Sequence, residues 1–244
     1  MFLVQAKAHI NDYKNSFVLW NKVLKKYPRA YIAYINLADA YKQKSNYKKA
    51  LEYVEKGLSI KETAKGLTLR GFLYSRNNKP VKAFSDYNKA LQIDSLYLPA
   101  YINRGNLYLY FGDYEKAVDD FDKAIKLYPE KAEPYFNKGV ALDFTGKTNE
   151  AIEYYNQAIE LNPDFIPAIK NRSIDYIIIK NTEKALSDIN HAININPHDG
   201  SLYMIRADIF ISLKNFNSAC NDLETAQKLG IPDASKMINH YCKK

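Results

Sequence analysis

The chain has 244 residues, of which 47% are hydrophobic, so it is long enough for one large folded domain or two small ones. Its formal charge of +8 comes from one end, because residues 1–65 carry 13 Lys and Arg against 5 Asp and Glu, while the rest carries 22 of each. No run approaches the roughly 18 apolar residues of a membrane span, and the first ten residues lack the features of a secretion signal. We expect a soluble protein without a membrane span, cytoplasmic or, if a signal sequence has been removed, periplasmic.

Taken in chain order, the predicted elements are pairs of amphipathic helices that recur with a period of 34 residues. Three stretches that begin at Ala100, Pro134 and Ala168 superpose without a gap. The same frame predicts seven repeats within residues 1–230, the first of them incomplete, and a C-terminal capping helix over 231–244. The complete repeats start near residues 31, 64, 98, 132, 166 and 200.

Small residues recur where the two helices of a repeat are expected to face each other. The first helices carry them at Ala38, Gly71, Gly105, Gly139, Ser173 and Ala207. The second helices carry them at Ala50, Ala83, Ala117, Ala151, Ala185 and Ala219. Such residues let two helices approach closely, and large aromatic side chains fill the space beside them. A proline then ends the second helix of several repeats, at Pro28, Pro129, Pro163 and Pro197.

This small–large–small pattern with a closing proline resembles the tetratricopeptide repeat family over essentially the whole chain, and the C-terminal segment resembles the ending of some bacterial members. The resemblance implies an all-α fold, a right-handed α-solenoid of helix-turn-helix repeats that forms an α-α superhelix. It also implies a scaffold that binds proteins. One position departs from the family, because the usual apolar residue is Leu37 in one repeat and basic in the others, at Arg70, Arg104, Lys138, Arg172 and Arg206.

One segment imitates a catalytic motif. Residues 141–148 fit a relaxed phosphate-loop pattern, with Ala141 at the first glycine position. A phosphate loop follows a buried strand, whereas these residues are expected to end one helix and form the turn that Gly112 and Asp113 form one period earlier. The histidines have no metal-ligand spacing, at His9, His191, His198 and His240. We therefore predict no enzyme, no cofactor, no metal and no small-molecule substrate.

Two further features concern the second helices and the cap. Carboxylates such as Asp119 and Asp120 are expected on a solvated outer face. Cys220 would begin the last second helix and Cys242 would end the cap packed against it, so the two are predicted neighbours. A disulfide and a pair of free core thiols both remain open.

In the family that the chain resembles, the first helices line a concave groove, and one position facing it is repeatedly asparagine here: Asn36, Asn103, Asn137 and Asn171. An amide both donates and accepts hydrogen bonds, so a row of asparagines can hold the backbone of an extended peptide. This resembles the asparagine ladder of the repeat domain of O-linked N-acetylglucosamine transferase. Local capping or packing of these residues is the alternative. The predicted peptide-binding set is Asn36, Asn103, Asn106, Asn137, Asn171, Tyr110, Phe136, Val140, Phe144, Ile174, Ile177, Met204 and Ile211.

The groove is predicted to be polar in the early repeats and apolar in the last three. The favoured function is a scaffold or adaptor that binds an extended peptide or a helix of a protein partner. Alternatives are a targeting module of a larger enzyme or complex, and self-association through the incomplete first repeat. Nucleic-acid binding is disfavoured, because lysines on a helical surface are usually solvated; it would use Lys22, Lys25, Lys26, Lys48 and Lys49.

Overall fold

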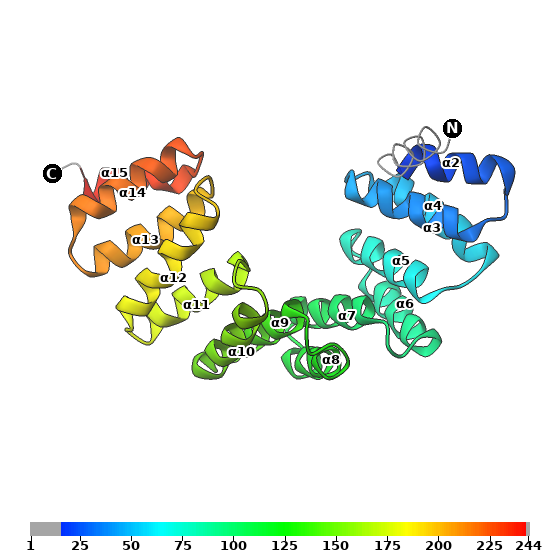
Figure 1. The fold of residues 1–244 in the computed structure, drawn as a ribbon, viewed down its shortest axis with the longest axis horizontal. Helices are drawn as coiled ribbons and strands as arrows, with labels where there is room; N and C mark the ends of the chain where they lie inside the picture. Colours follow the sequence, from blue (N-terminus) through cyan, green and yellow to red (C-terminus); the bar gives the residue numbers. More distant parts are fainter. Residues whose placement is uncertain (1–15, 243–244) are drawn as a thin grey trace, which may run out of the picture. The chain divides into compact units, whose positions relative to one another are not determined.

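The computed structural model describes residues 16–242, which form fourteen helices, α2 to α15, and no strand (Figure 1). The predicted all-α fold of paired helices is therefore confirmed. Residues 1–15 of the incomplete first repeat, which include His9, and the last two residues of the cap lie outside the described residues. Among residues 16–242, no helix combines the length and the apolar character needed to cross a membrane.

The chain divides after Leu127 into two compact units. Unit 1 is described over residues 16–127 and contains α2 (Ser16–Lys26), α3 (Tyr31–Gln43), α4 (Tyr47–Ile60), α5 (Ala64–Arg76), α6 (Pro80–Ile93), α7 (Leu98–Tyr110) and α8 (Tyr114–Leu127). Unit 2 is described over residues 128–242 and contains α9 (Ala132–Phe144), α10 (Thr148–Leu161), α11 (Ile166–Ile178), α12 (Thr182–Ile195), α13 (Gly200–Ser212), α14 (Phe216–Lys228) and α15 (Pro232–Tyr241).

Each turn inside a helix pair contains one residue with a positive φ, which reverses the chain after the first helix. These residues are Ser45, Asn78, Gly112, Gly146, Lys180 and Lys214. Glycine adopts this conformation freely because it has no Cβ atom, whereas a lysine in it is strained. The next helix is then capped in three turns by an asparagine side chain that accepts a backbone N–H, at Asn46, Asn181 and Asn215.

The two helices of a pair approach closely where the small residues stand. A Cβ atom added at Gly105 would lie 2.6 Å from a ring carbon of Phe121, and one at Gly71 would lie 2.6 Å from the Tyr87 ring. Both rings are buried, so each glycine faces an aromatic side chain on the second helix of its own pair. Successive first helices also pack within a unit, α5 on α7 in unit 1 and α11 on α9 in unit 2.

Four of the basic residues that depart from the family pattern form bidentate ion pairs with the second helix of the same pair. The pairs are Arg70 with Asp86, Arg104 with Asp120, Arg172 with Asp188, and Arg206 with Asp222. The guanidinium Nε and Nη2 atoms donate to the two carboxylate oxygens at 2.6 to 2.8 Å. In three cases Nη1 also donates to an asparagine of the preceding second helix, at Asn88, Asn156 and Asn190.

These ion pairs correct one expectation. Asp120 was expected on a solvated face, but it is 3% exposed and paired with Arg104. A buried carboxylate is tolerated because the guanidinium neutralises it and satisfies both oxygens. The arginine at this position therefore links three helices, in place of the apolar contact expected there.

The C-terminal end of unit 2 is closed by α15, which packs on α14. The Sγ atoms of Cys220 on α14 and Cys242, directly after α15, form a disulfide between residues 22 positions apart. Met204 and Ile211 pack against the buried residues of this end. The cap thus covers the last helix pair through apolar contacts and a covalent link.

Candidate functional site

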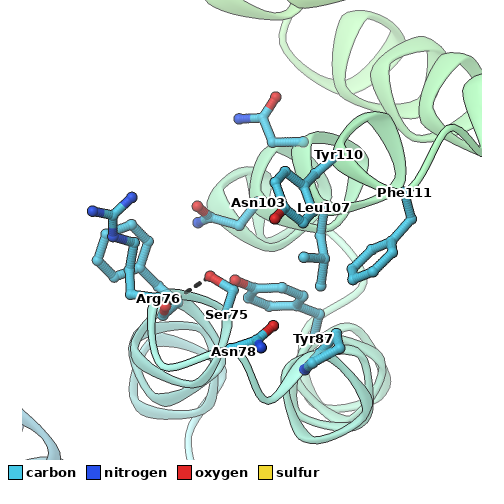
Figure 2. A pocket seen from close by; sticks show the side chains of 11 residues that line it. Ser75, Arg76, Asn78, Tyr87, Asn103, Leu107, Tyr110 and Phe111 are labelled. Atoms are coloured by element: carbon cyan, nitrogen blue, oxygen red, sulfur yellow. Dashed lines mark hydrogen bonds between the residues drawn. The ribbon is translucent and has the colours of Figure 1, made fainter.

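The first helices α5 and α7 of unit 1 flank an open pocket of about 530 Å³, and α6 contributes part of its wall (Figure 2). This volume is in the usual range of ligand sites, about 300–1,000 Å³. The lining residues are Phe72, Ser75, Arg76, Asn78, Pro80, Tyr87, Asn103, Asn106, Leu107, Tyr110 and Phe111. Three predicted groove residues therefore share one pocket: Asn103, Asn106 and Tyr110.

The inner wall of the pocket is formed by buried side chains. Figure 2 shows Tyr87 between Ser75 of α5 and Leu107 of α7. The Tyr87 ring is buried, and its burial raises the pKa of its hydroxyl well above the ordinary value. Ser75 Oγ donates to the backbone oxygen of Phe72 at 2.8 Å. Because of its raised pKa, the Tyr87 hydroxyl stays neutral. The hydrogen bond to Phe72 holds the Ser75 hydroxyl against its own helix.

The side of the pocket formed by α7 presents amides. Asn103 Nδ2 donates to the backbone oxygen of Pro99 at 2.7 Å, which leaves its Oδ1 atom as an acceptor. Asn106, three residues further along the same helix, is exposed. Neighbouring amides of this kind can donate to and accept from a peptide backbone.

The rim carries two exposed aromatic rings at the end of α7. Tyr110 is 79% exposed and Phe111 is 51% exposed, and their ring centroids lie 5.2 Å apart in an edge-to-face arrangement. Large exposed aromatic side chains beside polar groups are typical of interaction surfaces. The sequence pattern identified Tyr110, whereas Phe111 was missed because it stands in the turn and not on the first helix.

Asn36, the other predicted residue of unit 1, lies elsewhere. It borders a smaller pocket of about 170 Å³ beside Ile32 and Ile35. Lys65 Nζ donates to Asn36 Oδ1 at 2.6 Å. This asparagine is therefore held by a lysine and does not line the pocket between α5 and α7.

Of the two predicted asparagines of unit 2, Asn137 is buried and Asn171 is partly buried. Asn137 is 7% exposed, and its Nδ2 atom has no hydrogen-bond partner among the residues that the structure describes. Asn171 Nδ2 donates to the hydroxyl of Tyr155 at 3.3 Å. Asn137 is therefore shielded from solvent, whereas the Nδ2 atom of Asn171 is used in a local hydrogen bond.

The predicted apolar groove residues of unit 2 divide into two groups. Phe136 and Val140 pack against the core of the α9–α11 region, and Ile177 packs against the next core cluster. Phe144 and Ile174 are exposed, as is the neighbouring Ile178. The exposed apolar surface of unit 2 is therefore smaller than the sequence pattern suggested.

A buried carboxyl pair in unit 2 was missed. Asp175 of α11 is 3% exposed and lies with Asp143 of α9, whose Oδ2 atom accepts a hydrogen bond from the Tyr155 hydroxyl. Burial, and then the charge of Asp143, raise the pKa of Asp175 to about 7, and burial also raises the pKa of Asp143. The two carboxyl groups therefore resist simultaneous ionisation. The sequence did contain a signal for this pair, because other repeats have an apolar residue at the position of Asp175, such as Ala141 one period earlier.

The phosphate-loop-like segment has the expected helical context. Residues 141–148 comprise the end of α9, a turn and the first residue of α10, with Gly146 at φ +75°. No strand precedes the segment within the described residues, so it lacks the strand–loop–helix geometry that cradles phosphates.

Sequence comparison identifies the repeat. A tetratricopeptide repeat model matches residues 99–131 and 132–165, and a second tetratricopeptide repeat model matches residues 31–63. The human protein "Tetratricopeptide repeat protein 6" is 31% identical over 83 residues, which cover 34% of this chain and 16% of that protein.

Solved structures share the fold. The APC/C hetero-tetramer Cut9-Hcn1 matches with a TM-score of 0.82 at 14% identity, over 94% of this chain and 46% of that chain. PilF from Pseudomonas aeruginosa matches with a TM-score of 0.75 at 20% identity, over 86% of this chain and 97% of that one. A tetratricopeptide repeat protein from Parabacteroides merdae matches with a TM-score of 0.69 at 21% identity, over 99% and 96%. This chain thus spans less than half of the Cut9-Hcn1 chain and a small part of the human relative.

Proposed function

Because the chain belongs to the tetratricopeptide repeat family, we propose that it is a protein-interaction scaffold, and that it binds an extended peptide in the pocket between α5 and α7. Repeats of this kind present their first helices to a partner. The pocket is open, and both of its long walls come from successive first helices.

The observation that carries the proposal is the combination of groups in this one pocket. Asn103 and Asn106 offer amides for the peptide backbone, while the exposed rings of Tyr110 and Phe111 offer apolar contact area. An extended peptide exposes both kinds of group, since its backbone needs partners and alternate side chains point toward the pocket.

The proposal is narrower than an asparagine ladder along the whole chain. Asn137 is buried and Asn171 is bonded to Tyr155, so substituting them would perturb the core of unit 2. A binding test therefore has to use Asn103 and Asn106, whose replacement leaves the buried contacts of unit 1 in place.

The test starts from a displayed library of random twelve-residue peptides, selected on the full chain. Selected peptides are labelled, and their dissociation constants are measured by fluorescence anisotropy. We expect the double variant Asn103→Ala/Asn106→Ala to weaken binding at least tenfold, about 1.4 kcal/mol, because backbone hydrogen bonds are lost.

The matched control is Asn149→Ala/Asn217→Ala, which removes two exposed asparagines from unit 2. This control is expected to bind like the wild type. Equal affinity of all three proteins for the selected peptides would contradict the pocket as the binding site.

A further inference from the structure

We propose that the pocket between α5 and α7 selects peptides that carry an acidic side chain, aspartate or glutamate, beside an apolar one. This inference rests on the proposed function and names the chemistry of the segment that the same site takes. Three observations support it: Arg76 has no carboxylate partner among the described residues, unit 1 has a net positive charge, and the pocket has apolar lining residues.

Arg76 differs from the arginines that hold the helix pairs together. Arg70 and Arg104, on the first helices of the same unit, are each neutralised by a bidentate aspartate. Arg76 ends α5, is exposed, and has no carboxylate partner among the residues that the structure describes. Of the residues that line the pocket, it alone carries a formal charge. A guanidinium in this state offers two parallel donors to a carboxylate.

The orientation of Arg76 also has a physical cause. Its guanidinium carbon lies 5.9 Å from the ring centroid of Tyr47, within the range of a cation–π contact. Figure 2 shows the Arg76 side chain on the α5 side of the pocket, across from Asn103 on α7. A peptide that follows the amides of α7 therefore passes the guanidinium on its other side.

The net positive charge of unit 1 also favours a negatively charged partner. Residues 16–127 carry 20 Lys and Arg against 11 Asp and Glu, whereas residues 128–242 carry 11 against 15. An excess of positive charge attracts an acidic segment before contact and raises its association rate. The same excess of positive charge repels a basic segment, so it also disfavours the binding of basic peptides.

The apolar part of the pocket explains why an acidic residue alone is not enough. Phe72, Leu107 and Tyr87 line the wall, and Tyr110 and Phe111 form an exposed rim. An apolar side chain of the peptide covers the exposed rings of the rim, while its acidic neighbour reaches Arg76. Charge and apolar contact together define the selected segment.

The test uses peptides selected from the random library on the full chain, with amidated C-termini so that a terminal carboxylate is absent. We expect enrichment of Asp or Glu next to an apolar residue. Replacing that acidic residue by Asn or Gln is expected to weaken binding about fivefold, as is Arg76→Gln, in line with an ion pair that is only partly desolvated. Arg76→Glu is expected to select basic peptides instead.

The matched control is Arg29→Gln, which removes the same charge from an exposed arginine of the same unit outside the pocket. An equal loss for Arg29→Gln and Arg76→Gln would reduce the effect to general attraction and overturn the inference. Displacement of the peptide by a single-stranded RNA oligonucleotide at physiological salt would assign the basic surface to nucleic acid and also overturn it.

The remaining outcomes separate this inference from the proposed function. Peptides that depend on Asn103 and Asn106 but show no acidic preference would overturn the inference and leave the proposed function standing. A library from which no peptide binds would overturn both. Circular dichroism of each variant checks that the fold is retained.

Discussion

The two compact units are built from the same repeat but use their polar residues differently. Both units pair arginines with aspartates, and in unit 1 an additional arginine, Arg76, stands at an open pocket. In unit 2, Asp143 and Asp175 are placed between first helices, Asn137 is buried and Asn171 donates to Tyr155. The same position in a repeat can thus line an open pocket in one unit and pack internally in the other.

This difference shows that the repeat position alone does not decide a residue's role. Asn103 and Asn137 occupy equivalent positions, yet Asn103 lines an open pocket and Asn137 is buried. The equivalent Asn171 has a third setting, because its Nδ2 atom donates to the hydroxyl of Tyr155. Substitutions at matched positions of the two units test which contacts decide each role.

The largest effect is expected for the arginine ion pairs, which the two units share. Arg104→Met in unit 1 and Arg172→Met in unit 2 each leave a buried aspartate without its partner, at a cost of about 3 kcal/mol in the free energy of unfolding. Urea titration followed by circular dichroism measures it. The double variant Arg104→Met/Asp120→Leu is expected to recover most of the loss, and a single variant as stable as the wild type would refute the structural role.

A smaller effect is expected for the glycine contacts. Gly105→Leu would overpack the contact with the buried ring of Phe121 and lower the free energy of unfolding by about 1–3 kcal/mol. The control Gln92→Leu adds a comparable side chain to an exposed position of α6. Equal stability of the two variants in urea titration would mean that the helices are not in close contact at Gly105.

The carboxyl pair is expected to make the stability of unit 2 depend on pH. Below pH 7 the folded state keeps a proton on Asp175 that the unfolded chain, with a pKa of about 3.9, releases. The free energy of unfolding therefore falls as pH rises from about 4 to 7, and this contribution is lost above pH 7.

Asp175→Asn is expected to remove this slope and to stabilise the protein above pH 7 by on the order of 1–2 kcal/mol, because it removes a buried charge. Urea titrations between pH 5 and pH 8 measure the change. Asp164→Asn, at an exposed turn of the same unit, serves as the control. A slope that persists in Asp175→Asn would show that Asp175 is not its source.

The smallest effect is expected at the turn residues. Lys180 adopts φ +60° where Gly146 stands one period earlier, so Lys180→Gly is expected to raise the free energy of unfolding by about 1 kcal/mol. Lys180→Ala keeps the strain and should give no gain. A stabilisation by both variants would point to loss of the lysine charge instead of relief of the backbone.

The helix pairs and their close contacts could be predicted from the sequence, because several copies of one period align and each copy repeats the small residues at the same places. The ion pairs could not, since Arg104 and Asp120 are 16 residues apart and only the folded pair brings them together. For the same reason Asp120 was assigned to the wrong environment.

The candidate site was predictable in part. The period located Asn103, Asn106 and Tyr110 on the first helix, but it could not find Phe111, which lies in the turn after that helix. The direction of an amide depends on contacts with neighbouring helices, so the inward orientation of Asn137 was not visible in the pattern. Sequence periodicity places a residue along a helix, whereas packing decides what its side chain contacts.

The most direct test of the peptide site is hydrogen–deuterium exchange of the full chain with and without a selected peptide. We predict slower exchange in residues 72–80 and 103–113, which contain the pocket-lining parts of α5, α7 and their turns, and unchanged exchange in α11 to α14. Protection confined to unit 2, or a bound peptide that leaves residues 72–80 and 103–113 unprotected, would contradict the assignment of the site.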